Sequence, residues 1–241
     1  MKEFKQKLLL VSNSTLYGQK WLEHVKGIFS EFLKGKKHAI FIPYALHDHK
    51  LFTKKANSYF NKIGLFLKSI DDVESIESEI NQTEAIIVGG GNTFRLLKGL
   101  QKEDCLVLNT IKKTVESGVP FVGWSAGTNI ACPTIMTTND MPIVQQPSLD
   151  GLNLIPFQIN PHYLDPNPNS RHMGETREAR IKEFHEENDV PVIGLREGAW
   201  LRIDNKELTL GGINGAKIFK KDQTPIEYLP GTRFNLSLEK I

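Results

Sequence analysis

The sequence has few cysteines, no long hydrophobic run and no excess of charge of one sign. Only Cys105 and Cys132 occur among 241 residues, too few for a disulfide framework. No stretch approaches the roughly 18 consecutive apolar residues that a membrane-spanning helix needs. The first apolar run, Leu8 to Val11, is too short for the core of a signal peptide. We therefore expect a cytoplasmic protein with no membrane partner.

The charges nearly balance, since 30 basic residues face 28 acidic ones and give a net charge of +2. The lysines are scattered rather than gathered in a stripe, so we expect no nucleic-acid partner. Hydrophobic residues make up 39% of the chain, which excludes a disordered protein. The length suits one domain over residues 1–241, although length alone would allow two small ones.

Short apolar runs alternate with helical patterns through the first half of the chain. Strands are expected at residues 8–11, 39–42, 65–67, 85–88, 119–122 and 191–195, and helices at 21–32, 51–63, 93–100, 106–115 and 175–187. Residues 133–168 are expected to form loops with short strands, and 200–210 a hairpin. This order predicts an α/β fold with a mostly parallel sheet flanked by helices on both faces. Such sheets place their sites beyond the carboxyl ends of the strands, here after Val11, Val88 and Val122.

One of these strand ends carries the segment Gly123-Trp124-Ser125-Ala126-Gly127, which fits the pattern G-x-S-x-G. A strand precedes it and a possible helix follows, as the nucleophile elbow of a hydrolase requires. The turn would expose the Ser125 hydroxyl and direct the Ala126 amide toward a developing oxyanion. The other interpretation is a glycine-rich turn in which the serine caps the helix.

A serine nucleophile needs a base, and the chain offers seven histidines: His24, His38, His47, His49, His162, His172 and His185. His162 follows an expected strand and a proline, which makes it the candidate base, with a structural loop residue as the alternative. His24 and His185 lie among charged residues, and we expect them to be solvated. His47-Asp48-His49 is interpreted as a polar loop, because no third metal ligand has a convincing spacing, and no metal is expected.

The base in turn needs a carboxylate that fixes the imidazole tautomer. Glu197 follows the expected strand at 191–195 and is our first choice. Asp140, which is closer to the serine in sequence, is the alternative third member. Either could instead be an ordinary surface acid.

Another strand end carries Gly89-Gly90-Gly91-Asn92. No Gly-Lys-Ser/Thr follows, and Phe94 occupies the place of the third glycine of a dinucleotide fingerprint. Glycines let backbone amides turn inward, so the amides of Gly90 and Gly91 are candidates for an oxyanion hole together with Ala126. A plain structural turn is the alternative.

Several of these segments together resemble one family, peptidase E, the aspartyl dipeptidases. The resemblance rests on residues 10–16, 87–94, 123–134, 137–144, 158–162, 174–178 and 197–200, and so covers nearly the whole chain. It implies a fold like that of the class I glutamine amidotransferases, which is flavodoxin-like. It also implies a Ser125, His162 and Glu197 triad, an order that differs from Ser…Asp…His of the α/β-hydrolases. Thr128, where alanine is usual, and Arg196 beside Glu197 depart from the pattern.

The resemblance further implies a serine peptidase that hydrolyses dipeptides with an N-terminal aspartate, without a cofactor. An aspartyl side chain calls for a cation, and Arg177 lies in a matching motif, with Arg171 and Arg180 as alternatives. We expect Arg177 and Asn92 to bind the substrate, a small peptide, in a monomer or small homo-oligomer. The alternatives are a cyanophycinase-like serine hydrolase and a non-catalytic binding protein of the same fold.

Overall fold

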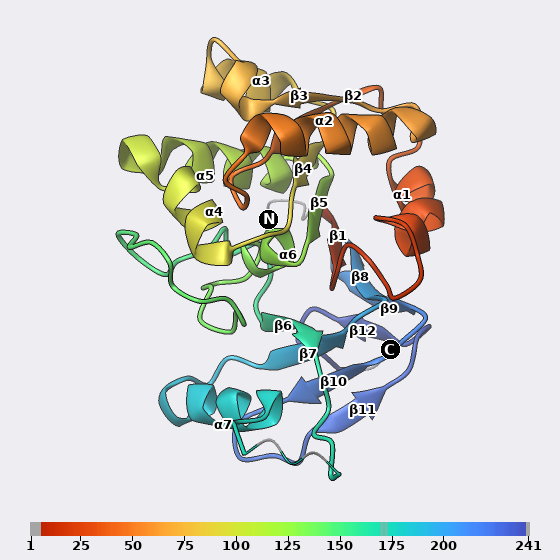
Figure 1. Ribbon diagram of the computed structural model, residues 1–241, viewed down its shortest axis with the longest axis vertical. Helices are drawn as coiled ribbons and strands as arrows, with labels where there is room; N and C mark the ends of the chain where they lie inside the picture. The colour runs from red at the N-terminus through yellow and green to blue at the C-terminus, as the bar shows by residue number, and fades with distance from the viewer. Residues whose placement is uncertain (1–5, 170, 172, 240–241) are drawn as a thin grey trace.

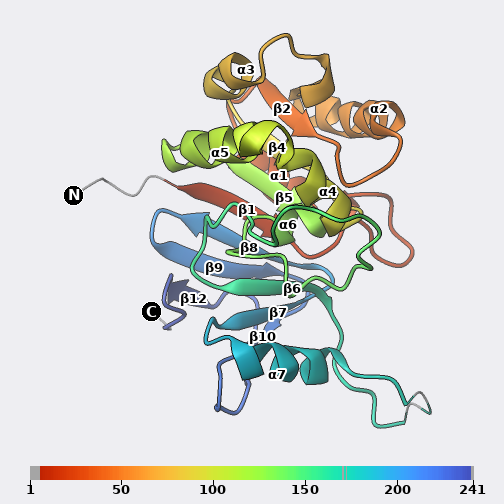
Figure 2. The same cartoon turned by 90° about the vertical axis from the view of Figure 1, so that its left-hand side faces the viewer.

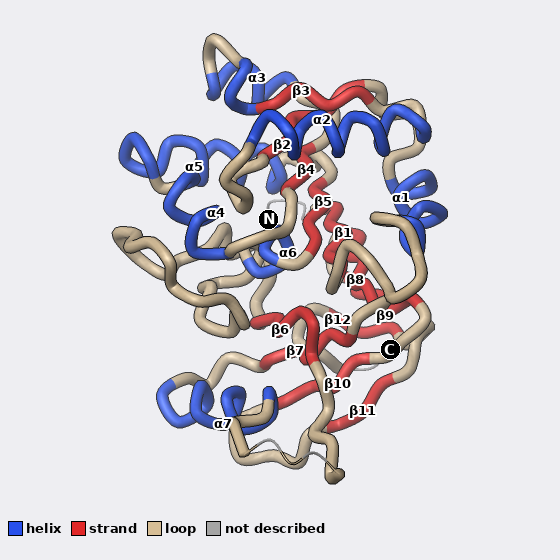
Figure 3. The backbone as a smooth tube through the Cα atoms, in the orientation of Figure 1, coloured by secondary structure: helices blue, strands red, loops and turns tan. Residues whose placement is uncertain are grey.

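The computed structural model describes residues 6–169, 171 and 173–239 as alternating strands and helices followed by a strand-rich C-terminal part (Figures 1 and 3). The strands are β1 Lys7–Val11, β2 His38–Ile42, β3 Phe66–Ser69, β4 Ile86–Val88, β5 Phe121–Trp124, β6 Gln158–Tyr163, β7 Val192–Arg196, β8 Ala199–Asp204, β9 Glu207–Gly212, β10 Ala216–Phe219, β11 Ile226–Tyr228 and β12 Arg233–Asn235. The helices are α1 Lys26–Phe32, α2 His49–Phe60, α3 Ile76–Gln82, α4 Thr93–Leu100, α5 Lys102–Glu116, α6 Ala126–Asn129 and α7 Arg177–Glu187, with short 3-10 turns at Glu23–Val25, Asn61–Ile63 and Ile70–Asp72.

The larger sheet has the strand order β12-β9-β8-β1-β5-β4-β2-β3. Its β1-β5-β4-β2-β3 half is parallel, whereas β8, β9 and β12 pair antiparallel. The register sets Val11 opposite Trp124, so β1 and β5 end at the same edge. The predicted mostly parallel α/β sheet is confirmed, and its carboxyl edge brings Ser12 and Ser125 together.

Helices cover both faces of this sheet because successive strand residues point to opposite sides (Figure 2). Leu8 and Leu10 belong to the buried cluster that includes side chains of α3 to α6, while Leu9 and Val11 belong to the cluster that includes those of α1 and α2. Fully buried Leu, Ile, Val and Phe side chains from the strands fill both layers. Burial of apolar area on both faces is the main stabilising contribution to such a sheet.

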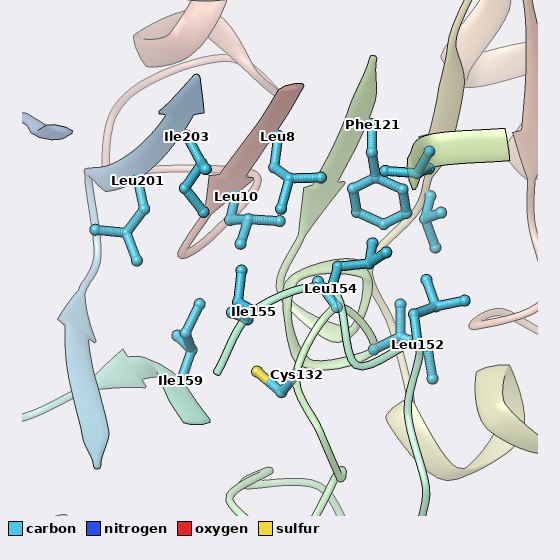
Figure 4. Packing of buried hydrophobic residues seen from close by; sticks show 14 of the residues in the cluster. Leu8, Leu10, Phe121, Cys132, Leu152, Leu154, Ile155, Ile159, Leu201 and Ile203 are labelled. Carbon is cyan, nitrogen blue, oxygen red and sulfur yellow. The ribbon is translucent and has the colours of Figure 1, made fainter. Parts of the chain in front are cut away.

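A second sheet, with the order β11-β10-β7-β6, lies below the first in Figure 1 and carries α7 beside it. Its β6 and β7 strands are parallel and the others antiparallel. One buried cluster includes side chains of both sheets, and Figure 4 shows Ile159 of β6 near Leu10 and Leu201 of the larger sheet. This shared core supports a single domain, which stays a prediction.

The sequence located most elements of the first half, including the left-handed Gly64 after α2, whose φ is 80°. The first expected helix begins later than predicted, at Lys26, because Leu22 has a φ of 57° and the chain turns there. Strands β10 to β12 were not predicted. The expectation for His185 was wrong: its side chain is buried, with Nε2 3.1 Å from the Val190 carbonyl oxygen. No helix in the described part of the chain is both long and apolar enough to cross a bilayer.

The glycines of the turn at residues 123–127 lie against backbone, which makes their packing testable. A Cβ on Gly127 would overlap the carbonyl group of Val88 in β4, whereas a Cβ on exposed Gly27 of α1 would meet nothing within 4 Å. We expect Gly127→Ala to lower the free energy of unfolding by about 1–3 kcal/mol. Gly27→Ala should raise it by about 0.5–1 kcal/mol, because alanine loses less backbone entropy in a helix. Chemical denaturation of both variants measures the difference, and an unchanged Gly127→Ala protein would contradict the packing argument.

Candidate active site

Ser125 lies on the sharp turn between β5 and α6, as the G-x-S-x-G pattern predicted. Its φ of 53° is unusual for a residue with a side chain, and its N–H donates to the Val11 carbonyl oxygen at 3.0 Å. A Cβ on Gly123 would overlap the Gly127 carbonyl, so both glycines are needed for the turn to close. The strained turn orients the hydroxyl away from the sheet.

The side chain of His162 meets this hydroxyl, with Nε2 2.9 Å from Ser125 Oγ. His162 lies in β6 at an irregularity where the register with β7 shifts between Pro161 and Tyr163. Its φ of 54° is again in the left-handed region. Two residues that meet across the site therefore both have strained backbones, a feature that clusters at functional sites.

Glu197 follows β7 and approaches the other side of the imidazole, with Oε1 2.7 Å from His162 Nδ1. Because a carboxylate can only accept, the Nδ1 atom carries the proton, and Nε2 is free to accept from the serine. The three side chains thus form a continuous hydrogen-bonded chain. This arrangement can remove a proton from the serine hydroxyl and stabilise the resulting imidazolium.

The chain of hydrogen bonds crosses between the two sheets. Ser125 follows β5 of the larger sheet, whereas His162 and Glu197 come from β6 and from the end of β7 in the smaller one. Their relative placement therefore depends on the packing between the sheets rather than on one local motif.

A residue that the sequence analysis did not single out, Ser12, joins these parts. Its hydroxyl is fully buried, donates to the Leu195 carbonyl oxygen at 2.8 Å and accepts from the His162 N–H at 2.9 Å. The bulge removes His162 from the β6–β7 ladder, and the His162 N–H donates to Ser12 Oγ in place of a carbonyl oxygen of β7. A polar residue at the end of a buried strand was the available signal.

Two asparagines hold the turn that carries Glu197. Asn13 Oδ1 accepts from the Gly198 N–H at 2.7 Å, and Asn214 Nδ2 donates to the Glu197 carbonyl oxygen at 2.7 Å. Gly198 has a φ of 82°, which glycine adopts without strain. The Glu197 backbone is therefore fixed although its side chain is about half exposed.

The glycine run lies directly beside the serine. A Cβ on Gly90 would be 3.0 Å from Ser125 Cβ, and Gly91 has a φ of 141°. Across residues 6–169, 171 and 173–239, the amides of Gly90, Gly91 and Ala126 donate to no protein acceptor. These amides are thus available to an oxyanion close to the serine.

Asn92 and Asp140 both form hydrogen bonds that stabilise the start of α4. Asn92 caps α4 by accepting from the Arg95 N–H, and its amide donates to the Met141 carbonyl oxygen, so both ends of the side chain are engaged. Asp140 Oδ2 accepts from the N–H and the hydroxyl of Thr93 at the start of α4. The structure thus brings Glu197, and not Asp140, to His162.

Arg177, the predicted reader of an acidic side chain, is the first residue of α7 and is half-buried. Burial and the charge of Arg180 lower the pKa of its guanidinium, while the carboxylate of Asp140 raises it. Asn139 in the same loop as Asp140 donates to the Pro161 carbonyl oxygen, next to His162. The charge of Asp140 thus acts on Arg177, and the loop that carries Asp140 contacts the backbone beside His162. Arg180 pairs with Glu175 at 3.4 Å, and Arg171 is exposed.

The two departures from the family pattern have structural explanations. Arg196 forms hydrogen-bonded ion pairs with Asp165 at 2.6 Å and Glu227 at 2.6 Å, which raise the pKa of its guanidinium. Its charge is thus compensated by residues other than Glu197. The buried Thr128 hydroxyl lies 2.7 Å from the Val11 carbonyl oxygen and 3.0 Å from that of Gly123, and so links β1 to β5.

The remaining histidines lie elsewhere. His49 pairs with Asp71 at 2.7 Å, and Asp48 caps α2 by accepting from the Leu51 N–H. Burial lowers the pKa of His24, whose ring nitrogens are both buried, so it is not solvated as expected. His172 lies outside the described residues. Within the described residues, no group of three or more His, Cys, Asp or Glu side chains could hold a metal ion.

A cavity of about 480 Å³ opens beside the serine. It is lined by Ser14, Thr15, Trp21, Leu46, Asp48, Leu51, Phe52, Lys55, Gly90, Gly91, Trp124, Ser125 and His162. Its volume is within the range of small-molecule sites, and most of its wall is apolar.

We expect the Ser12 contact to matter for the site more than for the fold. Ser12→Ala leaves the His162 N–H and the Leu195 carbonyl unpaired, which should lower stability by about 1–3 kcal/mol. The released His162 backbone should lower the rate of Ser125 labelling by a fluorophosphonate at least tenfold at a temperature where the variant is fully folded. Ser30→Ala, which removes an exposed hydroxyl on α1, is the control. An unchanged labelling rate for Ser12→Ala would contradict the positioning role.

Known proteins resemble this chain over almost its whole length. Residues 8–211 match the model of peptidase family S51. The chain is 45% identical over 225 residues to "Peptidase E" of Streptomyces coelicolor, which covers 93% of this chain and 92% of that protein. It is 42% identical to "Probable alpha-aspartyl dipeptidase" of Drosophila melanogaster, with 97% and 98% covered.

The fold is also found in a crystal structure of a peptidase from an acI-B1 actinobacterium. That chain is 16% identical, superposes with a TM-score of 0.73, and the match covers 97% of this chain and 98% of that one. At this identity the likeness concerns the fold alone. The family model and the two similar sequences decide the relationship: this chain belongs to peptidase family S51, a family of serine peptidases.

Proposed function

We propose that this protein hydrolyses dipeptides with an N-terminal aspartate, with Ser125 as nucleophile, His162 as general base and Glu197 as the carboxylate that orients it. The observation that carries the proposal is the continuous Ser125–His162–Glu197 hydrogen-bond chain, 2.9 Å and 2.7 Å long at its two contacts. The name of the similar Drosophila protein, an alpha-aspartyl dipeptidase, supports the substrate class.

The reaction begins when Ser125 Oγ attacks the carbonyl carbon of the peptide bond. His162 Nε2 accepts the hydroxyl proton as the new C–O bond forms, and the imidazolium is stabilised by Glu197 at Nδ1. The 2.9 Å contact already lies in hydrogen-bond range, so little reorganisation precedes proton transfer.

The carbonyl oxygen becomes negatively charged in the tetrahedral intermediate. The Ala126 amide at the start of α6 and the amide of Gly90 or Gly91 are the donors available to it. One such donor typically lowers the barrier by about 3 kcal/mol. A side chain at Gly90 would occupy the space next to Ser125, which explains the glycine there.

The intermediate collapses when His162 gives its proton to the leaving amine, and the C–N bond breaks. The aspartyl group is then bound to Ser125 as an ester. A water molecule, deprotonated by His162, attacks this ester, the bond between the acyl carbon and Ser125 Oγ breaks, and His162 returns the proton to Oγ as aspartate leaves. Every proton in this cycle passes through His162 Nε2.

Recognition of the N-terminal aspartate requires a cation for its side-chain carboxylate. Arg177 supports this role, because it is half-buried and without an ion pair of 4.0 Å or less in the described part of the chain. A guanidinium can bind a carboxylate through two parallel hydrogen bonds.

The first test is hydrolysis of Asp-Leu, Glu-Leu, Asn-Leu and Ala-Leu by the wild type and by Ser125→Ala. We expect Asp-Leu to be cleaved much faster than the other three dipeptides, and its cleavage to fall by about 10⁶-fold in the variant because the nucleophile is absent. Activity is followed by the release of leucine. Folded protein that labels at Ser125 but cleaves none of the four dipeptides would keep the serine hydrolase and reject the aspartyl substrate.

A second test concerns the acidic side chain of the substrate. Arg177→Gln should reduce the preference for Asp-Leu over Asn-Leu at least tenfold, because a charge-assisted pair is replaced by a neutral hydrogen bond. Arg180→Gln, on the same helix, is the matched control and should change the preference by less than twofold. The measurement is the ratio of kcat/KM for the two dipeptides, and an unchanged ratio in Arg177→Gln would exclude this residue.

A further inference from the structure

The cavity beside Ser125 contains a lysine that the proposed mechanism does not use. Lys55 lies on α2, and among the described residues that line this cavity it is the one lysine or arginine. Its ammonium group lies 4.6 Å from the centre of the Trp21 ring, an attractive cation–π contact. The contact holds a long, exposed side chain along the wall of the cavity.

The charge of Lys55 is available to a ligand. In the described part of the chain, no carboxylate lies within 4.0 Å of its ammonium group. Asp48, the one acid that lines the same cavity, directs Oδ1 to the Leu51 N–H as the cap of α2. Its negative charge lies at the N-terminus of that helix, where it is favourable.

The wall around Lys55 is apolar. Trp21, Leu51 and Phe52 line the cavity with it, and the Trp21 and Phe52 rings pack edge to face at 6.4 Å. A single cation on an apolar wall matches a group with one carboxylate and an apolar side chain. The C-terminal residue of an Asp-X dipeptide has this character, whereas the N-terminal aspartate carries both an ammonium and a carboxylate.

The two candidate carboxylate binders come from different parts of the fold. In both Figure 1 and Figure 2, α2 lies above α6, and α7 lies below α6. Lys55 belongs to α2, and Arg177 is the first residue of α7. Ser125 immediately precedes α6 and therefore lies between α2 and α7 in the fold. A dipeptide whose scissile carbonyl contacts Ser125 can therefore direct its two carboxylates to opposite sides.

On these grounds we propose that Lys55 binds the free α-carboxylate of the leaving amino acid and so selects dipeptides with an apolar second residue. The inference rests on the proposed function and adds a determinant of substrate length. In a longer peptide an amide replaces this carboxylate, and Lys55 loses its charged partner. The same cation would hold the leaving amino acid near His162, which must protonate its amine.

The test compares Asp-Leu with Asp-leucinamide, which differs only in the charge of its C-terminus. We expect the wild type to favour Asp-Leu at least tenfold in kcat/KM, since a charge-assisted pair is worth about that factor. Lys55→Gln should remove this preference by slowing Asp-Leu hydrolysis while changing Asp-leucinamide hydrolysis less than twofold. The different basicity of the two leaving amines cancels when variants are compared.

Two controls separate the charge of Lys55 from other effects. Lys54→Gln changes the neighbouring exposed lysine, which does not line this cavity, and should behave as the wild type. Lys55→Arg keeps the positive charge and should keep most of the preference. Thermal unfolding of each variant verifies that the protein remains folded.

Each result has a distinct meaning. If Lys55→Gln keeps the wild-type preference, or if the wild type cleaves both substrates equally, the role of Lys55 is wrong and the aspartyl dipeptidase stands. If Lys55→Gln instead loses the preference for Asp-Leu over Asn-Leu, Lys55 binds the aspartyl side chain and the proposal is overturned. If the wild type cleaves no aspartyl dipeptide, the proposed function fails and this inference fails with it.

Discussion

The left-handed backbone of Ser125 is the constraint on which the site depends. Its φ of 53° is kept by close packing around the turn, where Gly123, Gly127 and Gly90 leave no room for a Cβ. The N–H of the serine is bound to Val11 in the neighbouring strand, which ties the turn to the sheet. A nucleophile on a flexible loop would have to be ordered in every reaction cycle, whereas here the fold has already ordered it.

The same principle applies to the base. His162 also has a positive φ, and its N–H is held by the buried hydroxyl of Ser12. Ser12 and Asn13 directly follow β1, and together they fix His162 and the turn after Glu197. A short polar segment therefore positions two side chains that lie far from it in sequence. Such long-range contacts stabilise strained backbones that local sequence would not support.

Much of this could be predicted from the sequence, and the failures have physical causes. The apolar runs and the glycine turn located the parallel strands and Ser125, because both signals are local. Asp140 was not separable from Glu197 by sequence, since a carboxylate that binds the start of a helix and one that orients a histidine are the same chemical group. Asn92 caps α4, and its contact with substrate stays a prediction. The role of Ser12 depends on a bulge in β6, 150 residues away, and no spacing along the chain encodes that contact. Strands β10 to β12 were not predicted because their apolar residues are few and alternate with polar ones.

The hydrogen-bonded chain of Ser125, His162 and Glu197 crosses from the larger sheet to the smaller one. The distances within it therefore depend on how the two sheets pack against each other. A shift of about 1 Å between them would break the contact with the serine while every strand kept its own hydrogen bonds. A mild denaturant concentration that loosens the packing between the two sheets would therefore abolish activity before the secondary structure unfolds.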